Sequence, residues 1–179
     1  MTAPTLTTQR LVLRPYLRSD IPDLVRLIGA REVAATTLRI PHPYSVADAD
    51  EFLASLDAGD ELRLAIVLRE SSELAGGIGL RMEKSHQSAE LGYWIGLPYW
   101  GNGFATEAAR ALVQHGFDVM KLHRIYASHF SNNPASARVL QKLGMKPEGR
   151  LRDHILKWGH YYDLVLYGML ASDFGLTSS

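Results

Sequence analysis

The sequence predicts a single domain of the α/β class built on one mixed β-sheet, and three observations favour this fold. At 179 residues, one core can bury roughly 70% of the surface that the unfolded chain exposes. Strand-like and helix-like apolar patterns follow in the order βααββ, then βαβα, then a final pair of strands. The strand–helix–strand part is typical of parallel strands joined by a crossover helix. We expect residues 1–179 to form one domain with a core over about 9–171, and flexible termini at 1–8 and 172–179.

The first third of the chain predicts one strand and two helices. Residues 10–16 alternate between apolar and polar side chains, which is typical of a strand with one buried face. Residues 20–28 carry an apolar stripe at helical spacing, with a proline suited to the first turn. Residues 30–44 contain two prolines and predict irregular structure. Ser45, followed three residues later by an acid, then predicts the start of a second helix over residues 45–56.

The rest of the chain supplies the larger part of the sheet. Two apolar runs are separated by a polar turn and predict an antiparallel hairpin, and another strand, a helix and a strand follow. The expected ranges are 62–69 and 74–82 for the hairpin, 89–97 for the fourth strand, 106–119 for a helix, 124–130 for a strand, 134–143 for a helix, and 145–156 and 161–170 for a last hairpin. The sheet should therefore be antiparallel first and parallel across the crossover helix.

The most informative segment runs from Ala89 to Ala108, where an apolar strand enters a helix through a turn with two glycines. Free amides at the first helical turn, together with the helix dipole, favour a phosphate. Gly101 and Gly103 permit a positive φ and a close approach of the backbone. The turn lacks the lysine of a Walker loop and the third glycine of a dinucleotide fingerprint. It therefore predicts a pyrophosphate site of another kind, with a plain strand-to-helix connection as the alternative.

The composition excludes several function classes. Lysine plus arginine equals aspartate plus glutamate at 19 each, so no net charge attracts nucleic acid or an anionic membrane. The absence of cysteine excludes disulfides, a thiolate nucleophile and cysteine-ligated metals. His123 and His129 have no accompanying ligand cluster, so we expect no metal. No leader pattern or stretch of about 18 apolar residues is present, which predicts a soluble cytoplasmic protein.

Four motifs in sequence order lie at residues 9–15, 90–95, 100–108 and 133–145, and residues 148–152 and 159–163 extend the pattern. Together they resemble the GNAT superfamily of acetyl-CoA-dependent N-acetyltransferases, within it the ribosomal-protein-alanine (RimJ/RimL-like) branch. The resemblance implies a central twisted mixed sheet flanked by about four helices, with the fourth and fifth strands splayed apart. It also implies acetyl-CoA as cosubstrate.

The resemblance also suggests where acetyl-CoA binds. The pantetheine arm would lie between the splayed strands, against the backbone of Tyr93, Trp94 and Ile95. The residues of the pyrophosphate turn would be Trp100, Gly101, Asn102, Gly103, Phe104, Ala105 and Thr106. Many members begin this turn with glutamine or arginine, and Trp100 departs from that pattern. Asn133 and Ser136 stand where the branch places polar groups beside the cofactor, although Asn133 also suits an ordinary helix cap.

Amide formation needs a neutral amine, an acceptor for its proton and stabilisation of the departing thiolate. The resemblance implies that Glu90 is the base, and an exposed carboxylate at a strand end is the alternative. Ser136 would hydrogen-bond the thioester or the thiolate. Many members have a proton-donating tyrosine seven residues after the asparagine, and here that position is Leu140. Without cysteine we expect direct attack in a ternary complex.

The expected acceptor is the α-amine at a protein N-terminus, with ribosomal proteins suggested by the resemblance alone. An α-amine with a pKa of about 7.8 is neutral in roughly one molecule in seven at pH 7, whereas a lysine is neutral in fewer than about one in a thousand. The alternatives are a small amine (polyamine, amino sugar or antibiotic) and a non-catalytic acyl-CoA-binding module, which Leu140 and Trp100 suggest. Residues 36–45 and the last hairpin should determine the acceptor, and a monomer or homodimer is expected.

Overall fold

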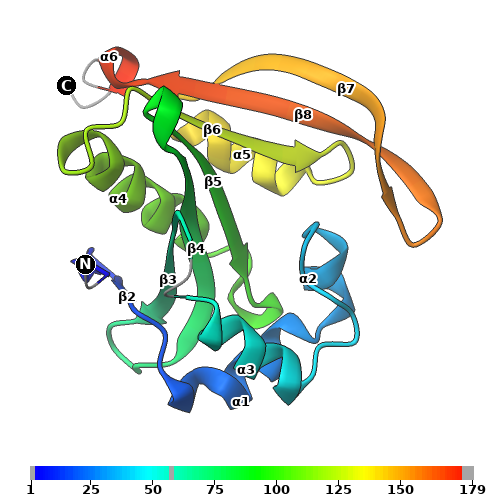
Figure 1. Ribbon diagram of the computed structural model, residues 1–179. Helices are drawn as coiled ribbons and strands as arrows, with labels where there is room; N and C mark the ends of the chain where they lie inside the picture. Colours follow the sequence, from blue (N-terminus) through cyan, green and yellow to red (C-terminus); the bar gives the residue numbers. More distant parts are fainter. Residues whose placement is uncertain (1–2, 57–58, 175–179) are drawn as a thin grey trace.

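The computed structural model describes residues 3–56 and 59–174, and it confirms the predicted single domain with a mixed sheet. Eight strands form the sheet in the order β1-β2-β3-β4-β5-β6-β8-β7 (Figure 1). Their bounds are β1 Leu6–Thr7, β2 Leu11–Arg14, β3 Glu61–Leu68, β4 Leu74–Glu83, β5 Ser88–Ile95, β6 Arg124–Phe130, β7 Lys146–Lys157 and β8 His160–Leu170. All neighbours are antiparallel except β5 and β6, which are parallel as expected.

Within the described residues there are six α-helices rather than about four. They are α1 Ile21–Ile28, α2 Arg31–Ala35, α3 Val46–Ala54, α4 Phe104–Asp118, α5 Pro134–Lys142 and α6 Ala171–Phe174. The two additional helices, α2 and α6, have five and four residues, which is too short for a periodic apolar pattern to be recognised. The prediction of irregular structure over residues 30–44 is therefore wrong at α2.

The sheet also begins earlier than the expected core limit of residue 9. Leu6 and Thr7 pair with β2, and a strand of two residues carries no alternation that a sequence pattern could reveal. At the other end, α6 occupies part of the segment expected to be flexible. Residues 1–2 and 175–179 of the two predicted termini lie outside the described residues.

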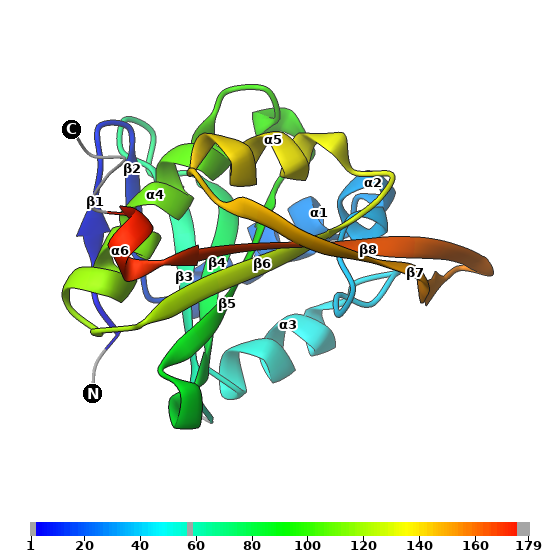
Figure 2. The ribbon, with the colours of Figure 1, turned by 90° about the horizontal axis from the view of Figure 1, so that it is seen from above.

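Helices cover both faces of the sheet. One apolar core lies between the sheet and α4 with α5, and a smaller core packs α1 and α3 against the opposite face. Figure 2 shows α4 and α5 on one side of the strands and α3 on the other. Because side chains alternate along a strand, neighbouring residues of β5 belong to different cores: Tyr93 packs on the first and Trp94 on the second.

The parallel strands separate shortly after they meet, as predicted. β5 and β6 are paired only from Ser88–Arg124 to Glu90–Tyr126. Beyond that point β5 stays with β4 as far as Ile95, while β6 stays with β8 as far as Phe130. The sheet therefore divides into two halves that diverge from Glu90 onward, which is visible in Figure 1.

The hairpin of β7 and β8 extends beyond the rest of the sheet and reaches the region of α2 (Figure 1). At its tip, Lys157 donates a hydrogen bond to the carbonyl of Thr37. The Trp158 ring lies 5.5 Å from the ring of His42, and the guanidinium of Arg31 lies 5.2 Å from the Trp158 ring. The tip and the α2–α3 connection thus contact each other across the open end of the divided sheet.

Candidate active site

A continuous hollow of about 1320 Å³ occupies the divergence of β5 and β6. Its walls come from β5, from the turn before α4, from the first turn of α5 and from residues 36–41. It therefore passes from the α4–α5 face of the sheet to the face of α1 and α3. A hollow of this shape can admit an extended ligand from one face and a second molecule from the other.

The turn between β5 and α4 has the predicted glycine geometry. Gly101 and Gly103 have φ values of 78° and 79°, and Gly103 occupies the N-cap of α4. A left-handed conformation at these positions costs glycine little but disfavours a branched side chain. α4 is 15 residues long, so its first-turn amides and its dipole produce a positive end at the hollow. These residues fit a pyrophosphate group.

An arginine that the sequence analysis did not single out supports this turn. Arg10 Nη1 donates to the carbonyl of Asn102 at 2.9 Å, and its Nε pairs with Glu107 Oε2 at 2.7 Å. The guanidinium also lies 4.8 Å from the ring centre of Phe104. Arg10 therefore places a cation beside the turn where Trp100 supplies none. Trp100 instead donates its indole N–H to the carbonyl of Ile95 at 2.7 Å.

Along β5, the backbone N–H and C=O groups of every second residue point toward the gap. The amide N–H of Gly96 donates a hydrogen bond to the carbonyl of Ala75 in β4 at 2.9 Å. Since N–H and C=O groups alternate in direction along a strand, those of Ile95 and Tyr93 point toward β6, where the pairing has ended. The backbone of Trp94 points toward β4 by the same rule, and its side chain packs in the smaller core. The three residues expected along the pantetheine arm are thus not equivalent.

On the α5 side of the gap, the side chains of Tyr93 and Ser136 meet. Their hydroxyl oxygens are 2.7 Å apart, and either can donate. Burial raises the pKa of Tyr93 to about 12, against a smaller lowering by the hydrogen bond with Ser136. Asn133 caps α5, since its Oδ1 accepts the amide of Ser136 at 3.2 Å. The expected cap role of Asn133 is therefore confirmed, and it fixes the turn that carries Ser136.

Leu140, at the position where many relatives would have a tyrosine, is completely buried in the larger core. The hydroxyl nearest to Ser136 comes instead from β5. The alternation of side chains along β5 is the sequence signal that indicates a Tyr93 side chain pointing toward α5.

Glu90 lies on the opposite face from Tyr93, at the point where β5 and β6 separate. Its side chain is 24% exposed. Arg81, which faces it across the β4–β5 ladder, and Arg39, from the α2–α3 connection, both contact Glu90 Oε2, the latter at 3.5 Å. Neither arginine was singled out in the sequence. The carboxylate and the Tyr93–Ser136 hydroxyl pair thus border one gap from its two faces.

The described part of the chain holds neither a group of metal ligands nor a membrane-spanning helix. Among residues 3–56 and 59–174, no group of three or more His, Asp or Glu side chains is placed to hold a metal ion. In the same part of the chain, no helix combines the length and apolar character needed to cross a membrane.

The divided sheet and the glycine turn at the start of α4 agree with the acetyltransferase fold that the sequence motifs resemble. The chain belongs to the GNAT acetyltransferases, because the family described as "Acetyltransferase (GNAT) domain" matches residues 10–146. GNAT enzymes use acetyl-CoA as cosubstrate, so the chain is an acetyl-CoA-dependent N-acetyltransferase.

Individual relatives agree with this assignment. The uncharacterized N-acetyltransferase YoaA of Bacillus subtilis is 33% identical over 172 residues, covering 93% of this chain and 97% of the relative. The spermidine N(1)-acetyltransferase of Escherichia coli is 27% identical over 154 residues, covering 86% and 82%. The crystal structure of a GNAT-family acetyltransferase from Bacillus anthracis superimposes with a TM-score of 0.86 at 25% identity, covering 94% of this chain and 99% of that one.

Proposed function

We propose that this enzyme transfers the acetyl group of acetyl-CoA to the α-amine at a protein N-terminus, as in the ribosomal-protein-alanine branch that the sequence resembles. The observation that carries the proposal is the division of polar groups between the two faces of the gap. Glu90 lies on the face of α1 and α3, whereas Ser136, Tyr93 and the start of α4 lie on the other. An acceptor can therefore approach from one face and acetyl-CoA from the other.

The residues of the α4–α5 face suit the cosubstrate. The amides of residues 101–106 would bind the pyrophosphate, with the side chain of Arg10 holding the turn. The backbone groups of Tyr93 and Ile95 point into the gap and would bind the pantetheine arm, once the Trp100 indole yields the Ile95 carbonyl. Trp94 would contribute through packing, since its backbone points toward β4.

The chemistry follows from this placement. The amine nitrogen attacks the thioester carbon, a C–N bond forms and the C–S bond breaks. Glu90 would take the proton of the amine, directly or through a water, and an α-amine with a pKa of about 7.8 needs only a modest base. In the Tyr93–Ser136 pair one hydroxyl donates to the other, and the remaining O–H would donate a hydrogen bond to the departing thiolate. No covalent intermediate on the protein is required, and the chain has no cysteine to form one.

A polyamine acceptor is the second candidate. The spermidine N(1)-acetyltransferase of E. coli is a relative over most of the chain. Asp48 and Glu51 of α3 and Glu61 of β3 also line the hollow and could bind a cation. A cytoplasmic location, and a monomer or homodimer as the working form, stay predictions from the sequence.

The direct test measures release of free CoA from acetyl-CoA with peptides that begin with alanine or serine. The same peptides with an acetylated N-terminus are the control, and spermidine and an amino sugar complete the panel. The proposal predicts release that requires the free N-terminus. Release with spermidine or the amino sugar alone would assign a small-molecule acceptor instead.

A further inference from the structure

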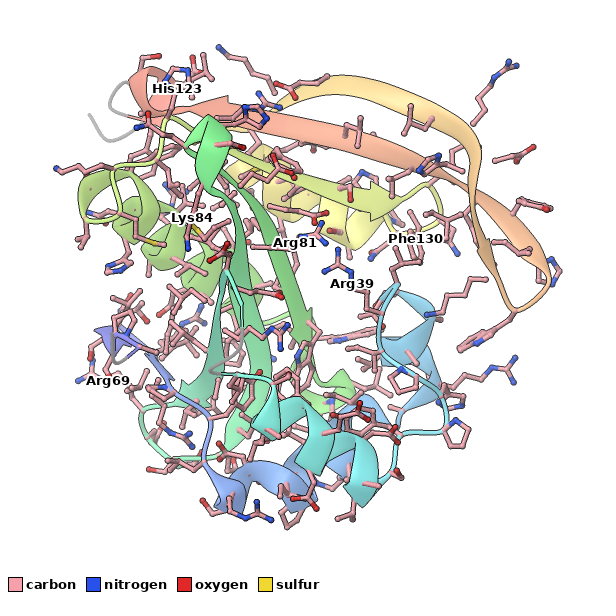
Figure 3. The ribbon with its side chains drawn as sticks, in the orientation of Figure 1. Arg39, Arg69, Arg81, Lys84, His123 and Phe130 are labelled. Atoms are coloured by element: carbon pink, nitrogen blue, oxygen red, sulfur yellow. The ribbon has the colours of Figure 1, made fainter. Side chains whose placement is uncertain are left out.

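Two arginines meet at one carboxylate oxygen on the acceptor face of the gap. Arg81 and Arg39 both contact Oε2 of Glu90, from β4 and from the α2–α3 connection respectively. Figure 3 shows both side chains pointing into the space between β5 and that connection. The arginine side chains are 43% and 56% exposed, so they remain accessible to a ligand.

The long contact of Arg39 with Glu90, at 3.5 Å, leaves most of the hydrogen-bond donors of this guanidinium unused. Each guanidinium presents five N–H donors, in a fork that matches both oxygens of a carboxylate. Among the described residues, Glu90 is the only acid that forms an ion pair with either arginine. Of the neighbouring acids, Glu61 pairs with Arg63 at 2.6 Å, and Glu83 accepts the Tyr126 hydroxyl at 2.7 Å. Hydrogen bonds from Tyr126 and Ser88 lower the pKa of Glu83, and the charge of Arg81 contributes to this lowering. In the part of the chain that the structure describes, Arg39 has its ion-pair contact with Glu90 alone, at 3.5 Å, so its guanidinium keeps donors for a ligand beside the place where the acceptor amine must attack.

The remaining acids of the hollow belong to a different element. Asp48 and Glu51 are on α3, and Asp48 already accepts the amide of Ser45 at 2.7 Å in the helix cap. A polyamine whose reactive amine reached the gap would place its charge beside Arg39 and Arg81. An acceptor with an anionic group near its amine would instead gain a charge-assisted hydrogen bond there.

We propose that the acceptor carries a carboxylate within a few bonds of its reactive amine, and that Arg39 and Arg81 bind this carboxylate. The inference deepens the proposed acetyl transfer to an α-amine and rests on it. Two sources have this chemistry: the side chain of an N-terminal aspartate or glutamate, and the α-carboxylate of a free amino acid.

The test compares kcat/KM, expressed per neutral amine, for acceptors that differ in the presence of a carboxylate. One pair is a peptide beginning with aspartate and its asparagine counterpart, and the other is alanine and alaninamide, with spermidine as a cationic reference. We expect the charged member of one pair to be preferred by about tenfold or more, as for a charge-assisted hydrogen bond. The pair that shows the preference identifies the source of the carboxylate.

The enzyme variants assign the preference to its residue. Arg39→Gln should remove it, and Arg39→Lys should restore part of it because the charge returns without the fork. Arg18→Gln is the control, since Arg18 is an exposed arginine paired with Asp50 outside the hollow, and it should keep the preference.

Each of the other possible outcomes would contradict one part of the proposal. A preference for spermidine, or for the neutral member of both pairs, would overturn the anionic acceptor while leaving acetyl transfer intact. An undiminished preference in Arg39→Gln would overturn the role of Arg39. Absence of CoA release with every amine would overturn the proposed function itself and this inference with it.

Discussion

Replacing Ser136 with alanine should slow acetyl transfer about ten- to a hundredfold without abolishing it, the loss that one hydrogen bond to a charged group corresponds to. The expected loss of rate follows from the way in which the Tyr93–Ser136 pair can interact with the thiolate. The pKa of Tyr93 is raised to about 12, whereas a thiol has a pKa of about 8.5. Full proton transfer from Tyr93 to the thiolate is therefore unfavourable by about 3.5 pKa units, or about 5 kcal/mol. The pair should consequently stabilise the thiolate through a hydrogen bond and leave it unprotonated.

The assay follows thiol release at saturating acetyl-CoA for Ser136→Ala, Tyr93→Phe and the double variant. Because the two hydroxyls are 2.7 Å apart and act as a unit, the double variant should be little slower than the slower single variant. The loss should be the same at pH 7 and pH 9, since no proton leaves the pair. Ser71→Ala, which removes a hydroxyl from an exposed serine of the β3–β4 turn outside the hollow, is the matched control and should be unchanged.

Two results would refute this reasoning. Unchanged kcat in both single variants and in the double variant would remove the pair from the mechanism. A loss that changes with pH between 7 and 9 would show that one of the hydroxyls delivers a proton after all.

Four further predictions address the base, the turn and the stability of the fold. Glu90→Gln should reduce kcat roughly 10²-fold with little change in acetyl-CoA affinity, and unchanged turnover would exclude Glu90 as the base. Gly103→Val places a branched residue at a φ of 79°, so calorimetry should show weaker acetyl-CoA binding, and retained affinity would contradict the pyrophosphate assignment. Leu140→Tyr should destabilise the fold by about 1–3 kcal/mol in urea denaturation, because the larger ring has no space in a fully buried site, and a gain of activity instead would contradict that placement. Burial acts to raise the pKa of Asp20, but hydrogen bonds from Arg14 and Leu17 outweigh it and lower the pKa. The ion pair should therefore stabilise the fold fully above about pH 4 and lose this contribution as the pH falls through the lowered pKa. Asp20→Asn should cost about 3 kcal/mol in urea denaturation at pH 7, and a cost that does not shrink as the pH falls below about 4 would contradict this assignment.

The sequence predicts long periodic elements well and short ones poorly. The strand expected over residues 124–130 has the same limits as β6, because its apolar residues alternate between two polar turns. The helix α2 has only five residues, between Ala30 and Thr36, so no periodic pattern indicates it. The separation of β5 from β6 was expected from the family resemblance alone. No local pattern in the sequence indicates the residue at which two paired strands separate.

The residues of the candidate site also divide into those that the sequence predicts and those that only the fold reveals. Ser136 and Glu90 could be proposed because motifs surround them, and the orientation of Tyr93 follows from strand alternation. The meeting of Arg39 and Arg81 at Glu90 could not be foreseen. It depends on the β4–β5 register and on the path of the α2–α3 connection across the sheet. Likewise, Arg10 and Glu107 are far apart in the sequence, and only the packing of α4 beside β2 brings them together.

The central claim is direct transfer of the acetyl group to an amine across the gap between β5 and β6. A rapid-quench experiment with radioactive acetyl-CoA and a peptide with a free N-terminus tests it most directly, by following the label in CoA, protein and peptide. We expect the label to pass from CoA to the peptide, and we expect no label on the protein when the peptide is omitted. Label attached to the protein without peptide, or label that stays on CoA with every amine, would contradict it.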